Sequence, residues 1–176
     1  MRGAGDGLGR TELLLIGGRS GVGKSTAAAA LHWSLSRDGV RHAVVEGDAL
    51  DLAFPAAAEH RLAEANLAAM WANYRRLGYR RLVYANTNSV LNAAALTAAM
   101  GDDPRVVAVL LEADGDAIAS RLGGRDAGES LRWHLRRSAE AAEQLDAEAP
   151  VGTARVATTG RTPQEVAEEI RGITGW

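Results

Sequence analysis

Short apolar runs alternate along this chain with longer segments whose apolar residues recur at helical spacing. The run Glu12–Gly17 (ELLLIG) leads into a glycine-rich stretch, and Arg105–Glu112 (RVVAVLLE) is apolar almost throughout. Continuous apolar runs of this length are typical of strands that are buried on both faces of a sheet. Three further strands are predicted at Arg41–Glu46, Arg80–Ala85 and Arg155–Thr158.

The segments between these runs are predicted to be helices. Within Pro55–Tyr74, the residues Leu67, Met70 and Trp71 share one face at 3.6-residue spacing, which favours core packing for that face. The sequence Thr162-Pro163-Gln164-Glu165 predicts the start of the last helix, with an N-cap, a proline at N1 and a glutamate at N3. The other predicted helices are Lys24–Arg37, Val90–Met100, Asp116–Leu122 and Glu129–Glu148.

Strands that alternate with helices predict an α/β fold. We expect a three-layer sandwich in which a five-stranded parallel sheet carries helices on both faces and binds ligands at the carboxyl ends of its strands. No internal repeat or linker divides the chain, so we predict one domain over residues 11–176, with a lid at about 121–130. Residues 1–10 are glycine-rich and are interpreted as a flexible tail.

Composition narrows the partners that the chain can have. The 176 residues are 47% hydrophobic and 24% charged, with a net charge of −2, so no overall positive field attracts long nucleic acid or an anionic membrane. No apolar run approaches the roughly 20 residues that span a bilayer. The absence of cysteine and of a recognisable signal peptide favours a cytoplasmic protein.

The segment from Gly18 to Ser25 (GRSGVGKS) matches G-x-x-x-x-G-K-[ST], the phosphate-binding P-loop. Lys24 is the only lysine in a chain that otherwise uses arginine for its positive charges. A compact ammonium can reach the β- and γ-phosphates, and the Ser25 hydroxyl is placed to bind Mg²⁺, so we expect ATP and Mg²⁺ as cofactors. The predicted nucleotide-binding residues of the loop are Gly18, Ser20, Gly21, Val22, Gly23, Lys24, Ser25 and Thr26.

Asp48 follows the second predicted strand, in the turn Gly47-Asp48. If the first two strands are neighbours, this carboxylate lies near the γ-phosphate, where it can orient or deprotonate an acceptor hydroxyl or help to hold Mg²⁺ through water. Asp51 is an acceptor-binding candidate and equally a turn residue. His60 lies on the next predicted helix among polar residues, where an acceptor pocket would form.

Asn86 and Asn88 end the third predicted strand, where many P-loop proteins carry the Walker-B aspartate that orders Mg²⁺. No aspartate is present there. The two asparagines are candidates for binding the acceptor, and the alternative is that the segment 86–89 is the N-cap of the following helix.

Arg121 and Arg125 flank a Gly-Gly pair after the fourth predicted strand. Glycines permit a mobile lid, and guanidinium groups on such a lid stabilise charge on a transferring phosphoryl group. The alternative is surface ion pairing with Asp126 or Glu129.

Taken together, the segments GGRSGVGKST, VEGDALD, SRLGGRD and TTGRTPQEVAEEI resemble the small P-loop kinases. This group contains nucleoside monophosphate, shikimate, gluconate and adenylyl-sulfate kinases and chloramphenicol phosphotransferase, and the resemblance covers most of the chain. It implies that the loop before the last helix contacts the adenine, which places Gly160 near the base.

The function that we predict is ATP-dependent transfer of the γ-phosphoryl group to a hydroxyl or phosphate of a small-molecule acceptor. In this hypothesis Lys24, Asp48, Arg121 and Arg125 are the catalytic residues. The alternative is a nucleotide-dependent regulatory ATPase that acts as a switch through a protein partner. No guanine-specifying N-K-x-D is possible with a single lysine, which argues against a standard GTPase.

Overall fold

The computed structural model describes residues 9–56, 60–124 and 128–176. In this part of the chain, five parallel strands form one sheet in the order β2-β3-β1-β4-β5. The central strand β1 pairs on both sides, so that Leu14 lies opposite Val83 and Val107. The strands are β1 (Glu12–Gly17), β2 (Ala43–Glu46), β3 (Arg81–Ala85), β4 (Arg105–Glu112) and β5 (Ala154–Ala157).

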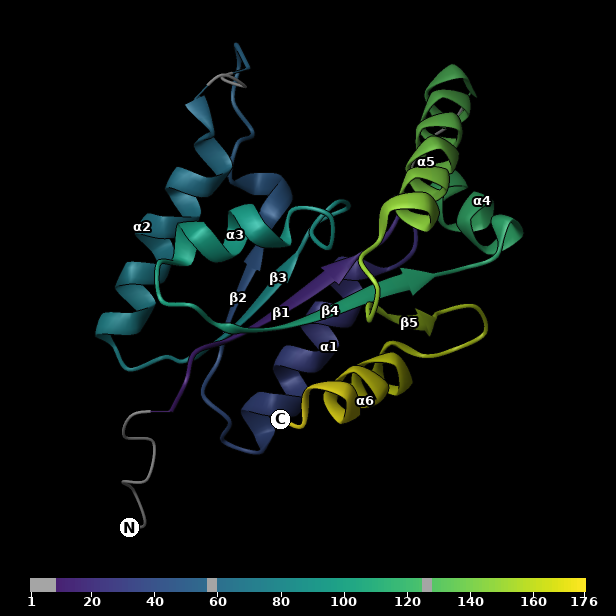
Figure 1. Cartoon of the computed structure of the whole chain (residues 1–176). Helices are drawn as coiled ribbons and strands as arrows, with labels where there is room; N and C mark the ends of the chain where they lie inside the picture. Colours follow the sequence, from purple (N-terminus) through teal and green to yellow (C-terminus); the bar gives the residue numbers. More distant parts are fainter. Residues whose placement is uncertain (1–8, 57–59, 125–127) are drawn as a thin grey trace.

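Helices cover both faces of the sheet, which confirms the predicted α/β sandwich (Figure 1). Helices α1 and α6 pack together on one face, and α2 packs beside α3 on the other. Helices α4 and α5 rise from the end of the sheet to which the β4 arrow points (Figure 1). The helices are α1 (Lys24–Arg37), α2 (Leu62–Arg76), α3 (Ala93–Met100), α4 (Gly115–Gly123), α5 (Gly128–Glu148) and α6 (Pro163–Thr174), and the 3-10 turn η1 (Gly47–Ala49) follows β2.

Two apolar clusters, one on each face, hold the sheet in place. Leu14 and Ile16 of β1 point into the cluster under α1 and α6, whereas Leu13 and Leu15 point into the cluster under α2 and α3. This alternation buries both faces of β1, and it explains why the first strand reads as a continuous apolar run. The phosphate loop, which follows β1 directly, is therefore anchored to the most buried strand of the sheet.

The predicted bounds of β1, α1 and β4 are confirmed, and so is the capping box of α6, in which the Glu165 amide donates to Thr162 Oγ1 at 3.2 Å. The predicted start of a helix at Pro55 is wrong, because α2 begins at Leu62. Pro55 and Ala56 are exposed, and the first fully buried residue of the helix is Leu67, so little apolar burial fixes the described residues ahead of Leu62.

The predicted start of a helix at Val90 is also wrong, since α3 begins at Ala93 and its N-cap is Asn92. The segment 86–89 therefore does not cap this helix. Instead, Asn86 Oδ1 accepts a hydrogen bond from the Asn88 amide at 3.0 Å, which turns the chain at the end of β3.

Asp102 organises the end of the sheet remote from the phosphate loop. One of its carboxylate oxygens, Oδ2, accepts hydrogen bonds from Thr11 Oγ1 at 2.7 Å and from Trp71 Nε1 at 3.2 Å. The same oxygen lies 3.2 Å from Nε of Arg75. This carboxylate thus joins the chain before β1 to helix α2. It also provides a hydrogen-bond acceptor for the indole N–H of the buried Trp71.

A histidine pair lies beside α1. Nδ1 of His42, which is buried, lies 2.8 Å from the Val40 carbonyl, and its Nε2 lies 2.9 Å from Nδ1 of His32. Burial is the main cause that lowers the pKa of His42, and the neighbouring His32 lowers it further, whereas the Val40 carbonyl opposes the shift.

None of the helices in the described ranges is long and apolar enough to cross a membrane. Most of the predicted tail lies outside the described residues, but Arg10 is described, and its Nη2 lies 3.4 Å from Asp103 Oδ2.

Candidate nucleotide and acceptor site

The phosphate loop connects β1 to α1 and requires glycine at defined positions. Gly18 has φ = 139°, and a Cβ atom there would lie 2.8 Å from the Leu111 carbonyl oxygen of β4. Gly21 and Gly23 also have positive φ values, of 82° and 103°. Positive φ is unfavourable for other residues, so these glycines allow the backbone to curl around an anion at the N-terminus of α1.

Lys24, the first residue of α1, folds back over this loop. Its Nζ donates to the Gly18 carbonyl at 2.8 Å and to the Arg19 carbonyl at 3.3 Å. Burial lowers the pKa of Lys24, and the carboxylates of Asp48 and Glu46 partly oppose that shift. The ammonium is therefore held at the mouth of the loop by weak backbone acceptors, which a phosphate can replace.

Glu46 is a site residue that the sequence reasoning did not identify. Ser25 Oγ donates to Glu46 Oε2 at 3.1 Å, which links the first turn of α1 to the last residue of β2. The sequence carries a signal for Glu46, because this acid is the last residue of the second predicted strand, two residues before Asp48. A hydroxyl and a carboxylate side by side are oxygen ligands of the kind that Mg²⁺ or its bound water prefers.

Asp48 lies in the η1 turn and faces the phosphate loop, and both it and Lys24 line a cavity of about 430 Å³. The expectation that the first two strands are neighbours is wrong, because β3 lies between β2 and β1. The carboxylate reaches the loop because Asn86, at the end of β3, bridges the gap: its Nδ2 donates to Asp48 Oδ1 at 2.6 Å.

The turn that carries Asp48 is fixed by the strand next to it. A Cβ atom on Gly47 would lie 2.4 Å from the hydroxyl of Tyr84, so only glycine fits there. Burial, and to a smaller degree the neighbouring Asp51 and Asp48, raises the pKa of Tyr84 to about 12. The Tyr84 phenol therefore stays neutral at physiological pH, and it serves as a rigid wall behind the acidic turn.

Arg121, on α4, is tied to the phosphate loop. Its Nη1 donates to the carbonyls of Gly21 at 3.3 Å and Val22 at 3.1 Å, and its Nη2 donates to the Thr158 carbonyl at 3.0 Å. Its guanidinium thus lies in the wall of the 430 Å³ cavity that Lys24 and Asp48 line, which we call the nucleotide cavity because it adjoins the phosphate loop. Arg125, the second predicted lid arginine, lies outside the described residues.

The segment after β5 forms the opposite wall of the nucleotide cavity. Thr158 is buried, and its Oγ1 donates to the Val22 carbonyl at 3.0 Å, while Arg161 and Pro163 line the cavity. Gly160 lies between Thr158 and Arg161 in the chain with φ = 71°, and it is not one of the residues that line the cavity. Arg161 also lines this cavity, and the sequence did not predict it as a site residue.

A second cavity, of about 460 Å³, lies on the other side of the loop. Asn86 and Asn88, from the end of β3, form one wall, and residues of α5, including Trp133 and Arg137, form the other. Ser20 of the phosphate loop lines both cavities. The two cavities therefore meet at Ser20 and at the Asn86–Asp48 hydrogen bond.

Two predicted acceptor residues lie apart from both cavities. Asp51 is exposed after the η1 turn, and His60 is exposed just before α2. Neither lines a cavity among the described residues. Within the same ranges, no three His, Cys, Asp or Glu side chains cluster to hold a metal ion, so Mg²⁺ would depend on Ser25, Glu46, water and phosphate oxygens.

Comparison with solved structures confirms the predicted resemblance of this fold to that of the small P-loop kinases. No family model and no curated protein matches the chain. The APS kinase of Mycobacterium tuberculosis in complex with AMPPNP and APS superposes with a TM-score of 0.59 at 22% identity, over 96% of this chain and 100% of that one.

Two other kinds of protein share the fold with similar TM-scores and similarly low sequence identity. The tunicamycin resistance protein of Deinococcus radiodurans has a TM-score of 0.61 at 20% identity, over 94% of this chain and 96% of that one. The shikimate kinase of Acinetobacter baumannii, in complex with shikimate, has a TM-score of 0.58 at 14% identity and 94% coverage of both chains. At such identities the likeness establishes the fold.

Proposed function

We propose that this protein is an ATP-dependent phosphotransferase that moves the γ-phosphoryl group of ATP to a hydroxyl or phosphate of a small polar molecule. The observation that carries the proposal is the shared cavity of Lys24 and Asp48 beside a second cavity on the far side of Ser20. One cavity suits a triphosphate, the other suits an acceptor, and a carboxylate lies where they meet.

The nucleotide is held by the phosphate loop and Lys24. The loop amides and the N-terminus of α1 attract the phosphates, and the Lys24 ammonium exchanges its contacts with the Gly18 and Arg19 carbonyls for phosphate oxygens. Arg121 adds positive charge from the wall of the cavity. It also stabilises the conformation of the loop by donating hydrogen bonds to the Gly21 and Val22 carbonyls. We propose that the loop containing Gly160, between the cavity-lining residues Thr158 and Arg161, contacts the adenine.

Ser25 and Glu46 fit the magnesium ion that such transfer needs. When bound, Mg²⁺ would neutralise the negative charge that develops between the β- and γ-phosphates. The Ser25 hydroxyl, which donates to Glu46 Oε2 at 3.1 Å, would be a direct ligand, and the Glu46 carboxylate would accept hydrogen bonds from metal-bound water. In this arrangement Glu46 fulfils the task for which the third strand provides no aspartate.

Asp48 acts on the acceptor. Asn86 holds one carboxylate oxygen through its hydrogen bond at 2.6 Å, which leaves the other oxygen to accept the proton of an acceptor hydroxyl or to orient it. Asn88, Trp133 and Arg137 offer the acceptor an amide, a ring face and a cation. We propose no acceptor contact for Asp51 and His60 in this conformation.

The test is an assay of ATP consumption with Mg²⁺, with and without a pooled panel of nucleosides, nucleotides, sugars and antibiotics, read by mass spectrometry. The proposal predicts a product heavier by one phosphoryl group whose formation requires the panel. Tight ATP binding with slow hydrolysis that no acceptor stimulates would contradict transfer and favour a regulatory switch.

A further inference from the structure

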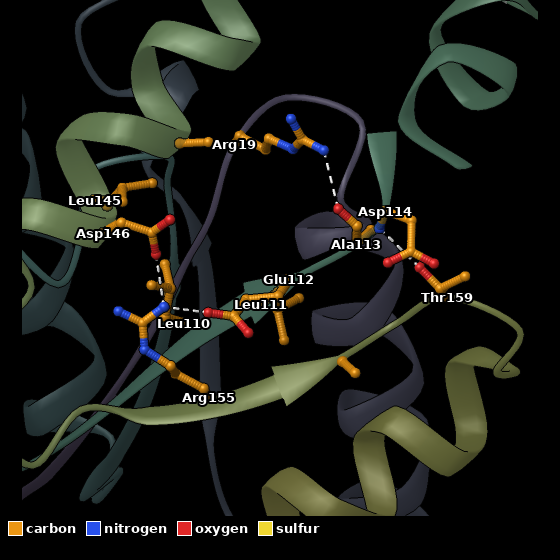
Figure 2. A pocket seen from close by; sticks show the side chains of 12 residues that line it. Arg19, Leu110, Leu111, Glu112, Ala113, Asp114, Leu145, Asp146, Arg155 and Thr159 are labelled. Carbon is orange, nitrogen blue, oxygen red and sulfur yellow. Dashed lines mark hydrogen bonds and ion pairs between the residues drawn. The ribbon is translucent and has the colours of Figure 1, made fainter. Parts of the chain in front are cut away.

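A third cavity, of about 730 Å³, lies between the carboxyl ends of β4 and β5 and helix α5 (Figure 2). It shares no described lining residue with the nucleotide cavity or the second cavity. The function proposed above does not use it. Its volume is within the range of small-molecule sites, which is roughly 300–1,000 Å³.

One end of this cavity carries an excess negative charge. Nη1 of Arg155, on β5, donates to Asp146 Oδ1 of α5 at 2.7 Å and also to Glu112 Oε1 at the end of β4 (Figure 2). One guanidinium thus faces two carboxylates, and all three side chains are exposed by about two fifths or more, Asp146 most at 67%. A cation that enters here meets carboxylate oxygens that a single arginine only partly neutralises.

The other end holds a cation and an anion that do not neutralise one another. The Arg19 guanidinium donates to a neutral acceptor, the Ala113 carbonyl, at 2.9 Å, and it forms no ion pair in the described part of the chain. Asp114, which precedes α4, makes no capping bond with its carboxylate. Its backbone is engaged instead: its amide donates to Thr159 Oγ1 at 2.9 Å, and its carbonyl accepts from the Ile118 amide at 3.1 Å. Figure 2 shows the Arg19 and Asp114 side chains on this side of the cavity, apart from Arg155.

The wall between the two ends is aliphatic. Leu110 of β4 and Leu145 of α5 line it and are each only 2% exposed. The cavity therefore combines an isolated cation, an isolated anion, a short apolar surface and a second end that is anionic. Its lining contains three carboxylates and two guanidinium groups, which gives a net charge of −1.

We propose that this cavity binds a basic amino acid or a closely similar zwitterion. The ligand carboxylate pairs with Arg19, its α-ammonium pairs with Asp114, and its methylene chain lies along Leu145. Its distal ammonium then reaches the carboxylates of Glu112 and Asp146. A ligand of net charge +1 neutralises a cavity of net charge −1, and each ionic group finds a partner of opposite sign.

Isothermal titration calorimetry of the full chain with free L-lysine, in the absence of nucleotide, tests this proposal. We expect saturable binding of one L-lysine per chain. Norleucine, which lacks the distal ammonium, and cadaverine, which lacks the carboxylate, should each bind at least about tenfold more weakly, since each loses a charge-assisted contact. The proposal is overturned if L-lysine gives no saturable binding, or if either analogue binds as tightly.

Variants locate the binding. D114N and D146N should each weaken L-lysine binding by about tenfold or more. D116N and E143Q are matched controls, because these exposed acids lie on α4 and α5, close in sequence to Asp114 and Asp146 but outside the cavity, and they should leave the affinity unchanged. Circular dichroism verifies the fold of each variant. Equal affinities for all four variants would place the binding elsewhere and overturn the assignment, whatever the outcome of the kinase assay.

Discussion

Replacing Asp48 by asparagine is the sharpest test of the proposed chemistry. Asparagine keeps the shape of the side chain and retains an oxygen for the hydrogen bond from Asn86 Nδ2, which is 2.6 Å long in the structure. Because this hydrogen bond is exposed, its change from charged to neutral should cost less than about 1.5 kcal/mol of stability. The variant therefore removes the negative charge and the proton acceptor without removing the turn.

The expected effect is on turnover. Loss of a positioned general base costs about 10²- to 10⁴-fold in rate, which corresponds to about 2.7–5.4 kcal/mol of transition-state stabilisation at 1.36 kcal/mol per factor of ten. ATP affinity should change by less than about threefold, because the loop amides and Lys24 are untouched and only a carboxylate that repels phosphate is lost.

The assay measures kcat with saturating Mg²⁺, ATP and acceptor, and the Kd of ATP by calorimetry. D51N is the matched control, because Asp51 is exposed and lines none of the described cavities, and its kcat should stay within about twofold of the wild type. If D48N turned over at the wild-type rate, or if its whole defect lay in ATP binding, the role assigned to Asp48 would be refuted.

Three further outcomes follow from other parts of the structure. E46Q should raise the Mg²⁺ concentration for half-maximal activity about three- to tenfold, since the variant lacks the carboxylate that accepts hydrogen bonds from metal-bound water. An unchanged Mg²⁺ titration would contradict the proposed role of Glu46 in the metal site. D102A should lower the free energy of unfolding, measured in urea, by about 2–4 kcal/mol, because three donors lose their shared acceptor. The control D103N changes a side chain that is 92% exposed and should alter the free energy by less than about 0.5 kcal/mol. Equal effects of the two substitutions would refute the hydrogen-bond network around Asp102. The pKa of His42 is lowered from 6.5 in the folded state, so the unfolded chain takes up this proton first, and the stability of the fold falls as the pH decreases through 6.5. Between pH 7.5 and 5.5, H42N should therefore lose less stability than the wild type or the control variant H60N. The same dependence of stability on pH in all three proteins would contradict the burial of a neutral His42.

The sequence predicted the layers of the fold well because apolar periodicity records burial. The run Arg105–Glu112 was assigned to its observed bounds since both faces of β4 are covered for much of its length. The start of α2 was predicted too early because alanines have high helix propensity but little surface to bury, so propensity alone did not set the boundary.

The site was predicted in part, and the misses share a physical cause. The phosphate loop is a local motif, and its residues are read directly from the chain. The partnership of Ser25 with Glu46, and of Asp48 with Asn86, depends on the strand order, in which β3 separates β2 from β1. A pattern along one sequence does not contain that order. Arg121 was singled out for its charge, yet its contacts to the loop carbonyls arise only from the packing of α4.

Transfer of the phosphoryl group to an acceptor, as opposed to water, is the central claim. The most direct measurement uses ATP labelled with ¹⁸O in the γ-phosphoryl group, with Mg²⁺ and the acceptor panel, and follows the label by mass spectrometry. The account predicts that the label appears in a phosphorylated acceptor at a rate that D48N lowers by about 10²-fold or more. Label that appears only in inorganic phosphate, at the same rate with and without acceptors, would contradict it.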